Sequence, residues 1–146
     1  MLPGFDLAGY LPAGIYDAGW DEFYNRFCFS PRRQFLLAGL RLALDDLAKA
    51  GCGCVYVDGS FVTSKPFPLD YDACFDVTGV DPALLDPVFR DMTDGRRAQK
   101  QKYGGEFVPA GALHAATGFG FLEFFQMDRN GRRKGIVRLA PREAEV

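Results

Sequence analysis

Apolar side chains recur along the first third of the chain with the spacing of a helix. Trp20, Phe23 and Phe27 of WDEFYNRF stand at i, i+3 and i+7, which predicts a short helix over residues 20–27. A longer helix is predicted from residue 31 to about residue 50, with Ser30 as its N-cap and Gly51 just past its end. The apolar stripe of this longer helix consists of Leu36, Leu40, Leu44 and Leu47. We expect the stripe to cover one face of a sheet.

Apolar runs later in the chain predict strands over residues 54–58, 70–77, 119–127 and 135–139. The run FGFLEFFQM at 119–127 is the strongest of these, and we expect it to form a hairpin with the last strand. Asp-Pro pairs and a Thr-Asp-Gly sequence predict short helices over 82–92 and 95–102. Residues 1–19 contain so many glycines and prolines that they predict an irregular N-terminal arm.

Strands and helices are mixed without a regular β-α-β alternation, so the predicted class is α+β. We expect a small mixed or antiparallel sheet with helices packed on it. The length of 146 residues suits one domain over 1–146. Because 48% of the residues are apolar and 14 of them are Phe, we expect an ordered core that is rich in phenylalanine.

Charge and cysteine content exclude several kinds of protein. The formal net charge of −2 gives no reason to expect a general nucleic-acid binder, although RNA remains open as an acceptor. No apolar stretch approaches the roughly 20 residues of a membrane-spanning helix, and the N-terminus lacks the regions of a signal peptide. A cytoplasmic location without a membrane is therefore expected. The Cys-x-Cys at 52–54 has no second pair and His114 is the only histidine, which favours small reduced thiols over a zinc site.

The segment VDGSFVTSKPFPLDYDACFDV, residues 57–77, contains the candidate chemistry. Asp70 and Asp72 stand two positions apart on a predicted strand, so their side chains point to the same face of the strand. Their Cα atoms lie roughly 6.6 Å apart. Two carboxylates so placed can bind one Mg²⁺ or Mn²⁺, or bridge two ions, and such ions normally recruit phosphates. Gly59 allows a phosphate close to the backbone, and Ser60 can donate its N–H and its hydroxyl. The alternative is an ordinary turn followed by a solvated strand entrance.

A Gly-Ser pair, nine residues and then Asp-Tyr-Asp-Ala is similar to the signature of the DNA polymerase β-type nucleotidyltransferase superfamily. LPAGI, YVDGSFVTSKP, GGEF and LEFFQMDRNGRRKGIVR more closely resemble an uncharacterised bacterial branch of minimal nucleotidyltransferase-like proteins. Two departures stand out: Asp58 replaces the usual apolar residue before Gly-Ser, and the loop lacks the Arg-Gly of many members. The resemblance implies that the strands over 54–58 and 70–77 are neighbours, with Ser60 close to the two aspartates.

The resemblance also implies a third carboxylate on a later strand between apolar residues. Glu123 in FLEFF fits this description best, and Asp76 is the competitor. Asp70, Asp72 and Glu123 would then bind Mg²⁺ or Mn²⁺, and Glu123 would help to deprotonate the attacking hydroxyl. For the triphosphate, the candidate residues are Gly59, Ser60, Lys65, Arg97 and Lys100.

The resemblance predicts transfer of a nucleotidyl group from a nucleoside triphosphate to an unknown hydroxyl acceptor. An alternative is a catalytically degenerate fold that acts as an antitoxin-like or regulatory partner of a second protein, with the aromatic N-terminal arm as its interface. A nuclease or a phosphatase that uses the same metal pair is a third possibility.

Overall fold

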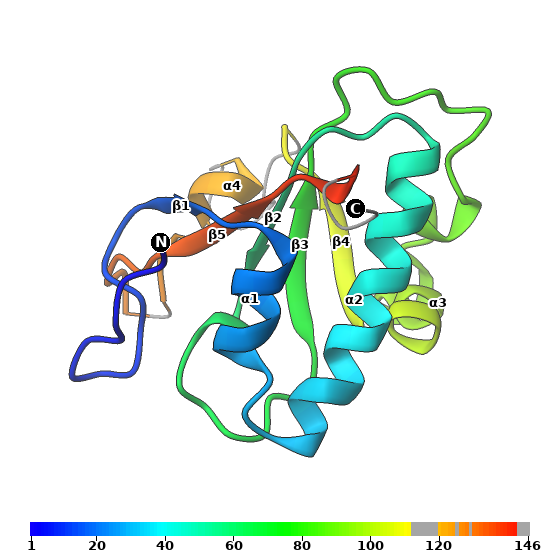
Figure 1. Cartoon of the computed structure of the whole chain (residues 1–146). Helices are drawn as coiled ribbons and strands as arrows, with labels where there is room; N and C mark the ends of the chain where they lie inside the picture. The colour runs from blue at the N-terminus through cyan, green and yellow to red at the C-terminus, as the bar shows by residue number, and fades with distance from the viewer. Residues whose placement is uncertain (112–119, 125, 129, 143–146) are drawn as a thin grey trace.

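Five strands form one mixed sheet in the order β1-β5-β2-β3-β4 (Figure 1). The computed structural model describes residues 1–111, 120–124, 126–128 and 130–142. The strands are β1 (Ile15–Asp17), β2 (Val55–Asp58), β3 (Tyr71–Phe75), β4 (Gly105–Pro109) and β5 (Ile136–Leu139). β2 is antiparallel to both of its neighbours, β3 and β5, whereas the outer pairs β1–β5 and β3–β4 are parallel. The α+β class with a mixed sheet is therefore confirmed.

The helices pack mainly on one face of this sheet, where α1 and α2 lie across the strands (Figure 1). The elements are α1 (Trp20–Phe27), α2 (Pro31–Lys49), α3 (Thr93–Tyr103) and the single turn α4 (Phe121–Phe124), with 3-10 turns η1 (Ser60–Val62) and η2 (Pro87–Arg90). The parallel pair β3–β4 requires a crossover, and η2 with α3 provides it. Within the described ranges, no helix is both long enough and apolar enough to cross a membrane.

Helix α2 forms where its capping signals predict. The Ser30 hydroxyl accepts a hydrogen bond from the Arg33 N–H at 3.2 Å, and Pro31 occupies the first turn. The predicted leucine stripe is buried, with exposed fractions of at most 1%. Both predicted N-terminal helices are thus confirmed, because a helical apolar period and a cap are local signals.

Alternation along the strands separates an apolar face from a polar one. The side chains toward the helices are Val55, Val57, Tyr71, Ala73, Phe75, Phe107, Val137 and Leu139, all buried. The residues between them include Asp58, Asp72 and Glu106, which therefore lie on the opposite face. The sheet thus presents its carboxylates on the face away from α2.

The strand predicted over 119–127 is wrong where the structure describes it. Residues Phe121–Phe124 form the helical turn α4, and Phe119 and Phe125 lie outside the described residues. The expected hairpin is also wrong, because β5 pairs with β1 and β2, although one bridge joins Met127 to Arg133. A continuous apolar run fits a buried strand and a helix equally well, so its periodicity could not distinguish between the two.

Other boundaries differ from the expectation in smaller ways. The N-terminal arm ends in β1, which pairs with β5 at the far end of the chain. Of the helix predicted over 82–92, only the 3-10 turn η2 forms. Residues 94–96 of α3 are left-handed, so its right-handed part begins near Arg97. Strand β4 was not predicted, because GEFVP is short and begins with the second glycine of a Gly-Gly pair.

Gly39 marks the closest contact between α2 and α3, and it generates a prediction. An ideal Cβ at this position would overlap the backbone carbonyl of Tyr103. Ala normally stabilises a helix relative to Gly by up to about 1 kcal/mol, but overpacking costs about 1–3 kcal/mol. We expect Gly39→Ala to lower the free energy of unfolding in a urea titration. A higher urea midpoint would contradict the close contact.

Candidate functional site

A sharp turn at Gly59 connects β2 to η1 and brings the chain beside β3. The φ of Gly59 is 84°, and an ideal Cβ would lie 2.6 Å from Asp72 Oδ2. A side chain there would therefore be strained by the backbone and would collide with the carboxylate. The predicted pairing of the two strands is confirmed, with Asp58 directly opposite Asp72 in the antiparallel register.

Carboxylates from three neighbouring strands line up across the sheet. Asp72 is the register partner of Asp58 on β2 and of Glu106 on β4. Directly paired residues point to the same face, so the three side chains form one line, which we call the acidic row. Asp70 precedes β3 by one residue and lies two positions from Asp72, on the same side.

The acidic row is an electrostatically costly arrangement. Burial, together with the charges of Asp70, Asp58 and Glu106, raises the pKa of Asp72 to about 7. Burial likewise raises the pKa of Asp58 to about 6, against the opposing charge of Lys134. Asp70 has a raised pKa from its partial burial and from Glu106. Such repulsion is the condition in which a bound cation is stabilising.

Two lysines flank the acidic row, one at each end. Lys100 on α3 lies with its Nζ 3.0 Å from Glu106 Oε1 and 3.9 Å from Asp70 Oδ2. Lys134, just before β5, lies with its Nζ 3.4 Å from Asp58 Oδ1. The Lys134 side chain is only 14% exposed. Lys100, one of the residues predicted to bind the triphosphate, thus lies beside Asp70 and Glu106, and Lys134 lies beside Asp58.

The loop between Gly59 and Asp70 is held by a buried arginine on α2. The Arg33 guanidinium donates to the carbonyls of Phe61 at 2.6 Å, Thr63 at 2.7 Å and Lys65 at 3.0 Å. It makes longer bonds, both at 3.4 Å, to the carbonyls of Ser60 and Phe27. Arg33 is fully buried, and burial lowers its pKa to about 10. The guanidinium of Arg33 therefore fixes the path of this loop.

The other predicted residues are more loosely connected to the acidic row. Ser60 begins η1 and is partly exposed, immediately after the Gly59 turn. Lys65 is exposed, although its charge opposes the raised pKa of Asp70. Arg97 is exposed near the start of the right-handed part of α3. Glu123 lies exposed on α4, and among the described residues no hydrogen bond or ion pair joins it to Asp70 or Asp72.

Sequence reasoning missed Asp58, Glu106, Lys134 and Arg33. Asp58 stands out in the sequence only as a departure from the nucleotidyltransferase pattern, and Glu106 lies in GGEF, whose strand was not predicted. Neither residue carries a local signal, because each acquires its place from the register with β3. Arg33 lies on α2 among residues of the first turn, where a solvated side chain is the usual expectation.

The donor set of the acidic row fits a hard cation, although the row does not form a ready-made metal site. Within the described part of the chain, no three His, Cys, Asp or Glu residues converge to hold a metal ion as they stand. Asp58 Oδ1, however, is buried without a hydrogen-bond partner among the described residues. A buried carboxylate oxygen that accepts no hydrogen bond and is paired only with the Lys134 ammonium, in a row of carboxylates, suits Mg²⁺ or Mn²⁺ by ligand chemistry.

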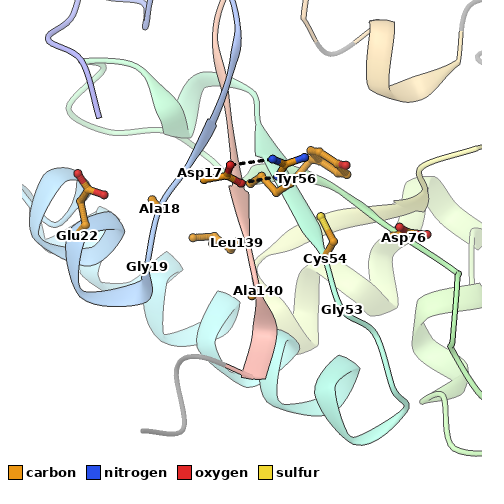
Figure 2. A pocket seen from close by; sticks show the side chains of 11 residues that line it. Asp17, Ala18, Gly19, Glu22, Gly53, Cys54, Tyr56, Asp76, Leu139 and Ala140 are labelled. Carbon is orange, nitrogen blue, oxygen red and sulfur yellow. Dashed lines mark hydrogen bonds and ion pairs between the residues drawn. The ribbon is translucent and has the colours of Figure 1, made fainter. Parts of the chain in front are cut away.

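A separate cavity of about 540 Å³ lies where β2 begins and β5 ends (Figure 2). Asp76, the competitor for the third carboxylate, lines this cavity. Its acidic groups have partners already: Asp17 binds Arg138, Glu22 accepts from the Leu2 N–H, and Asp76 accepts from the Thr78 N–H. The free thiol of Cys54 also lines it, with a pKa raised by burial. The cavity therefore shows no unsatisfied group that would select a ligand.

Comparison with known proteins identifies a family for nearly the whole chain. The family described as "Family of unknown function (DUF6932)" matches residues 3–140. No curated protein and no solved structure matches the chain.

The burial of Arg33 predicts a large difference between two adjacent arginines. Arg33→Met removes the donors of five carbonyls, several of them buried, and should lower the free energy of unfolding by about 3 kcal/mol or more. Arg32→Met is the matched control, because Arg32 is only partly buried and bonds to two carbonyls of the same loop, Pro68 and Leu69. It should cost about 1 kcal/mol or less. Equal losses in urea unfolding would contradict the assigned role of Arg33.

The raised pKa of Asp72 predicts the pH dependence of stability without metal. In the unfolded chain Asp72 ionises near pH 4, whereas in the folded protein its pKa is about 7. The folded state therefore binds the extra proton, and its stability falls as pH rises between about 4 and 7. Asp72→Asn should flatten this fall and be at least as stable as the wild type at pH 8. Chelated protein unfolded in urea across this range provides the measurement, and identical slopes would contradict it.

Proposed function

We propose a function for this chain, which belongs to the DUF6932 family: transfer of a nucleotidyl group from a nucleoside triphosphate to a hydroxyl acceptor, with Mg²⁺ as cofactor. The single observation that carries the proposal is the register of β2, β3 and β4. It aligns Asp58, Asp72 and Glu106 beside the Gly59 turn. A metal–triphosphate complex requires carboxylates that bind the metal and a backbone turn that a phosphate can approach closely. Both elements are adjacent here.

Asp70, Asp72 and Glu106 are the residues that we propose as metal ligands. Their supporting feature is mutual proximity, since Lys100 lies within ion-pair distance of both Asp70 and Glu106. Glu123, the sequence-based choice, is the alternative third ligand, but its exposed place on α4 supports it less. Bound there, Mg²⁺ supplies charge neutralisation at the phosphates and a lower pKa for the acceptor hydroxyl.

The chain's own groups would seat the triphosphate. The backbone at Gly59 leaves room for a phosphate, and Ser60 offers an N–H and a hydroxyl at the start of η1. The charges of Lys65 and Lys100 both act on Asp70, so both can bind the outer phosphates, and Arg97 lies one helical turn before Lys100. Arg33 contributes indirectly, because it fixes the loop that presents Ser60.

The proposed reaction is an in-line displacement at the α-phosphorus. The acceptor oxygen forms a new bond to phosphorus, and the bond to the pyrophosphate oxygen breaks. The acceptor proton passes to a carboxylate of the acidic row, and Glu106, with a side chain that is 29% exposed, is the one that we propose. Lys100 is near enough to Glu106 to stabilise the negative charge there before the transfer.

A partner-binding role is the second candidate, and one cavity favours it. An apolar cavity of about 460 Å³ lies beside the edge strand β4, lined by residues such as Phe75, Phe89 and Phe107. Val77 and Met92 at its margin are more than half exposed, with fractions of 52% and 63%. The N-terminal arm suits an interface less well, since Leu2 and Leu11 are buried in the protein's own core. An antitoxin-like or regulatory partner would therefore dock at this cavity. A cytoplasmic location, favoured by four free cysteines, belongs to either proposal.

Thermal melts with Mg²⁺ and a non-hydrolysable nucleoside triphosphate test the site. A ligand that binds only the folded state raises the melting temperature, and at 100 times its dissociation constant it adds about 2.7 kcal/mol. We expect this rise for the wild type and its loss in Asp72→Asn and Glu106→Gln. Glu123→Gln is the matched control and should keep it.

Loss of the rise in Glu123→Gln but not in Glu106→Gln would move the third ligand to α4. The proposal would be overturned if the melting temperature of the wild type did not change with Mg²⁺ and any nucleotide. Incubation with α-labelled nucleotides and host lysate then distinguishes transfer, which labels an acceptor and releases pyrophosphate, from hydrolysis.

A further inference from the structure

We infer that Lys134 is an exchangeable counter-ion of the acidic row: it pairs with Asp58 in the absence of metal and binds a phosphate of the nucleotide when Mg²⁺ is present. The inference rests on the proposed function and deepens it. Lys134 is not among the residues that the sequence pattern indicates for nucleotide binding.

The contact between Lys134 and Asp58 is close but incomplete. Their charged atoms are 3.4 Å apart, with side-chain exposures of 14% and 3%. The geometry is nevertheless that of an ion pair without a hydrogen bond, so Asp58 Oδ1 has no hydrogen-bond partner among the described residues. A contact of 3.4 Å between charged atoms stabilises a lysine less than a short, well-aligned hydrogen bond to the carboxylate would. Lys134 can therefore exchange Asp58 for another negatively charged partner.

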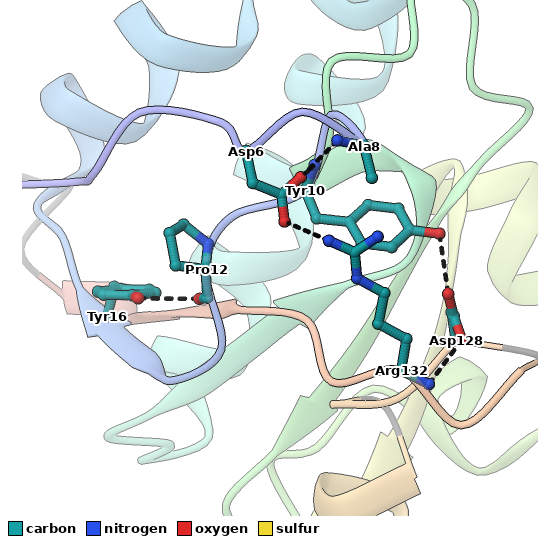
Figure 3. Close-up of polar contacts among 7 residues, drawn as sticks. All are labelled: Asp6, Ala8, Tyr10, Pro12, Tyr16, Asp128 and Arg132. Atoms are coloured by element: carbon teal, nitrogen blue, oxygen red, sulfur yellow. Dashed lines mark hydrogen bonds and ion pairs between the residues drawn. The ribbon is translucent and has the colours of Figure 1, made fainter.

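The position of Lys134 is set by the rest of the chain and not by Asp58 alone. The Lys134 N–H donates to the Gln126 carbonyl at 2.8 Å, which closes the turn before β5. Inside this turn Asp128 accepts from the N–H of Arg132 at 2.9 Å. Figure 3 shows that the N-terminal arm holds both residues, Asp128 through Tyr10 and Arg132 through Asp6. The lysine thus approaches the acidic row from a turn that is anchored independently.

The electrostatics explain why metal would release it. The carboxylates of Asp58 and Asp72 are direct register partners, so a cation at Asp72 reduces the negative potential that Lys134 experiences. Lys134 and the metal then compete for the same charge, and binding of one disfavours the other. The released ammonium lies next to the place where the Gly59 turn would seat a phosphate, which offers it a new partner.

A charge cycle with Mn²⁺ as the probe tests the competition. Free Mn²⁺ is counted by electron paramagnetic resonance at a temperature where circular dichroism shows every variant folded. Lys134→Met should bind Mn²⁺ about tenfold more tightly than the wild type, and Asp58→Asn about tenfold more weakly. The double variant, which removes both charges, should return close to the wild-type affinity. Lys102→Met is the control, because Lys102 pairs with Asp46 and Asp86 instead.

The nucleotide supplies a second, independent readout. A non-hydrolysable triphosphate should tighten Mn²⁺ binding in the wild type and in Asp58→Asn, and about tenfold less in both variants that lack Lys134. If the wild type binds Mn²⁺ but Lys134→Met binds it no more tightly than Lys102→Met, the inference is overturned and the proposed function stands. If the wild type binds no Mn²⁺ with or without nucleotide, the proposed function itself fails.

Discussion

The Arg33 guanidinium is the interaction on which the arrangement of the site depends. It stands in the first turn of α2, is fully buried, and has only backbone carbonyls and aromatic rings as partners. Burying a cation without a carboxylate is expensive, so the fold tolerates it because the planar fork satisfies several carbonyls at once. Those carbonyls belong to the loop between β2 and β3. Helix α2, whose leucine face rests on the sheet, therefore also determines where the loop beside Asp72 runs.

The acidic row also costs free energy of folding, but through buried negative charge instead of buried positive charge. Three carboxylates in register on adjacent strands repel one another, and burial adds to the repulsion, as the raised pKa values of Asp58 and Asp72 show. Lys100 and Lys134 offset part of this charge from the two ends. A fold selected only for stability gains nothing from such a row. Local destabilisation of this kind is typical of a site whose favourable partner is a ligand.

Both features meet at Gly59. The turn there is possible only because no side chain separates the backbone from Asp72, and the loop it opens is the one that Arg33 holds. The N-terminal arm adds a further restraint, since Tyr10 bridges to Thr63 and also bonds to Asp128 in the turn that carries Lys134. Segments far apart in the sequence thus converge on one side of the sheet, and the first fifteen residues hold two of its loops together.

The sequence by itself determined the elements whose signals are local. Helices α1 and α2 follow from periodicity and caps, and the motif of the nucleotidyltransferase superfamily predicted the pairing of β2 with β3, which places Gly59 beside Asp72. Only the tertiary structure determined which residues lie next to Asp58 and Asp72. Glu106 meets Asp72 through the crossover over residues 76–104, Lys134 reaches Asp58 from a turn near the C-terminus, and FLEF becomes a helix where a strand was expected. The physical reason is that a single charged residue carries no periodic signal. Its role is created by register and burial, which depend on residues distant in the chain.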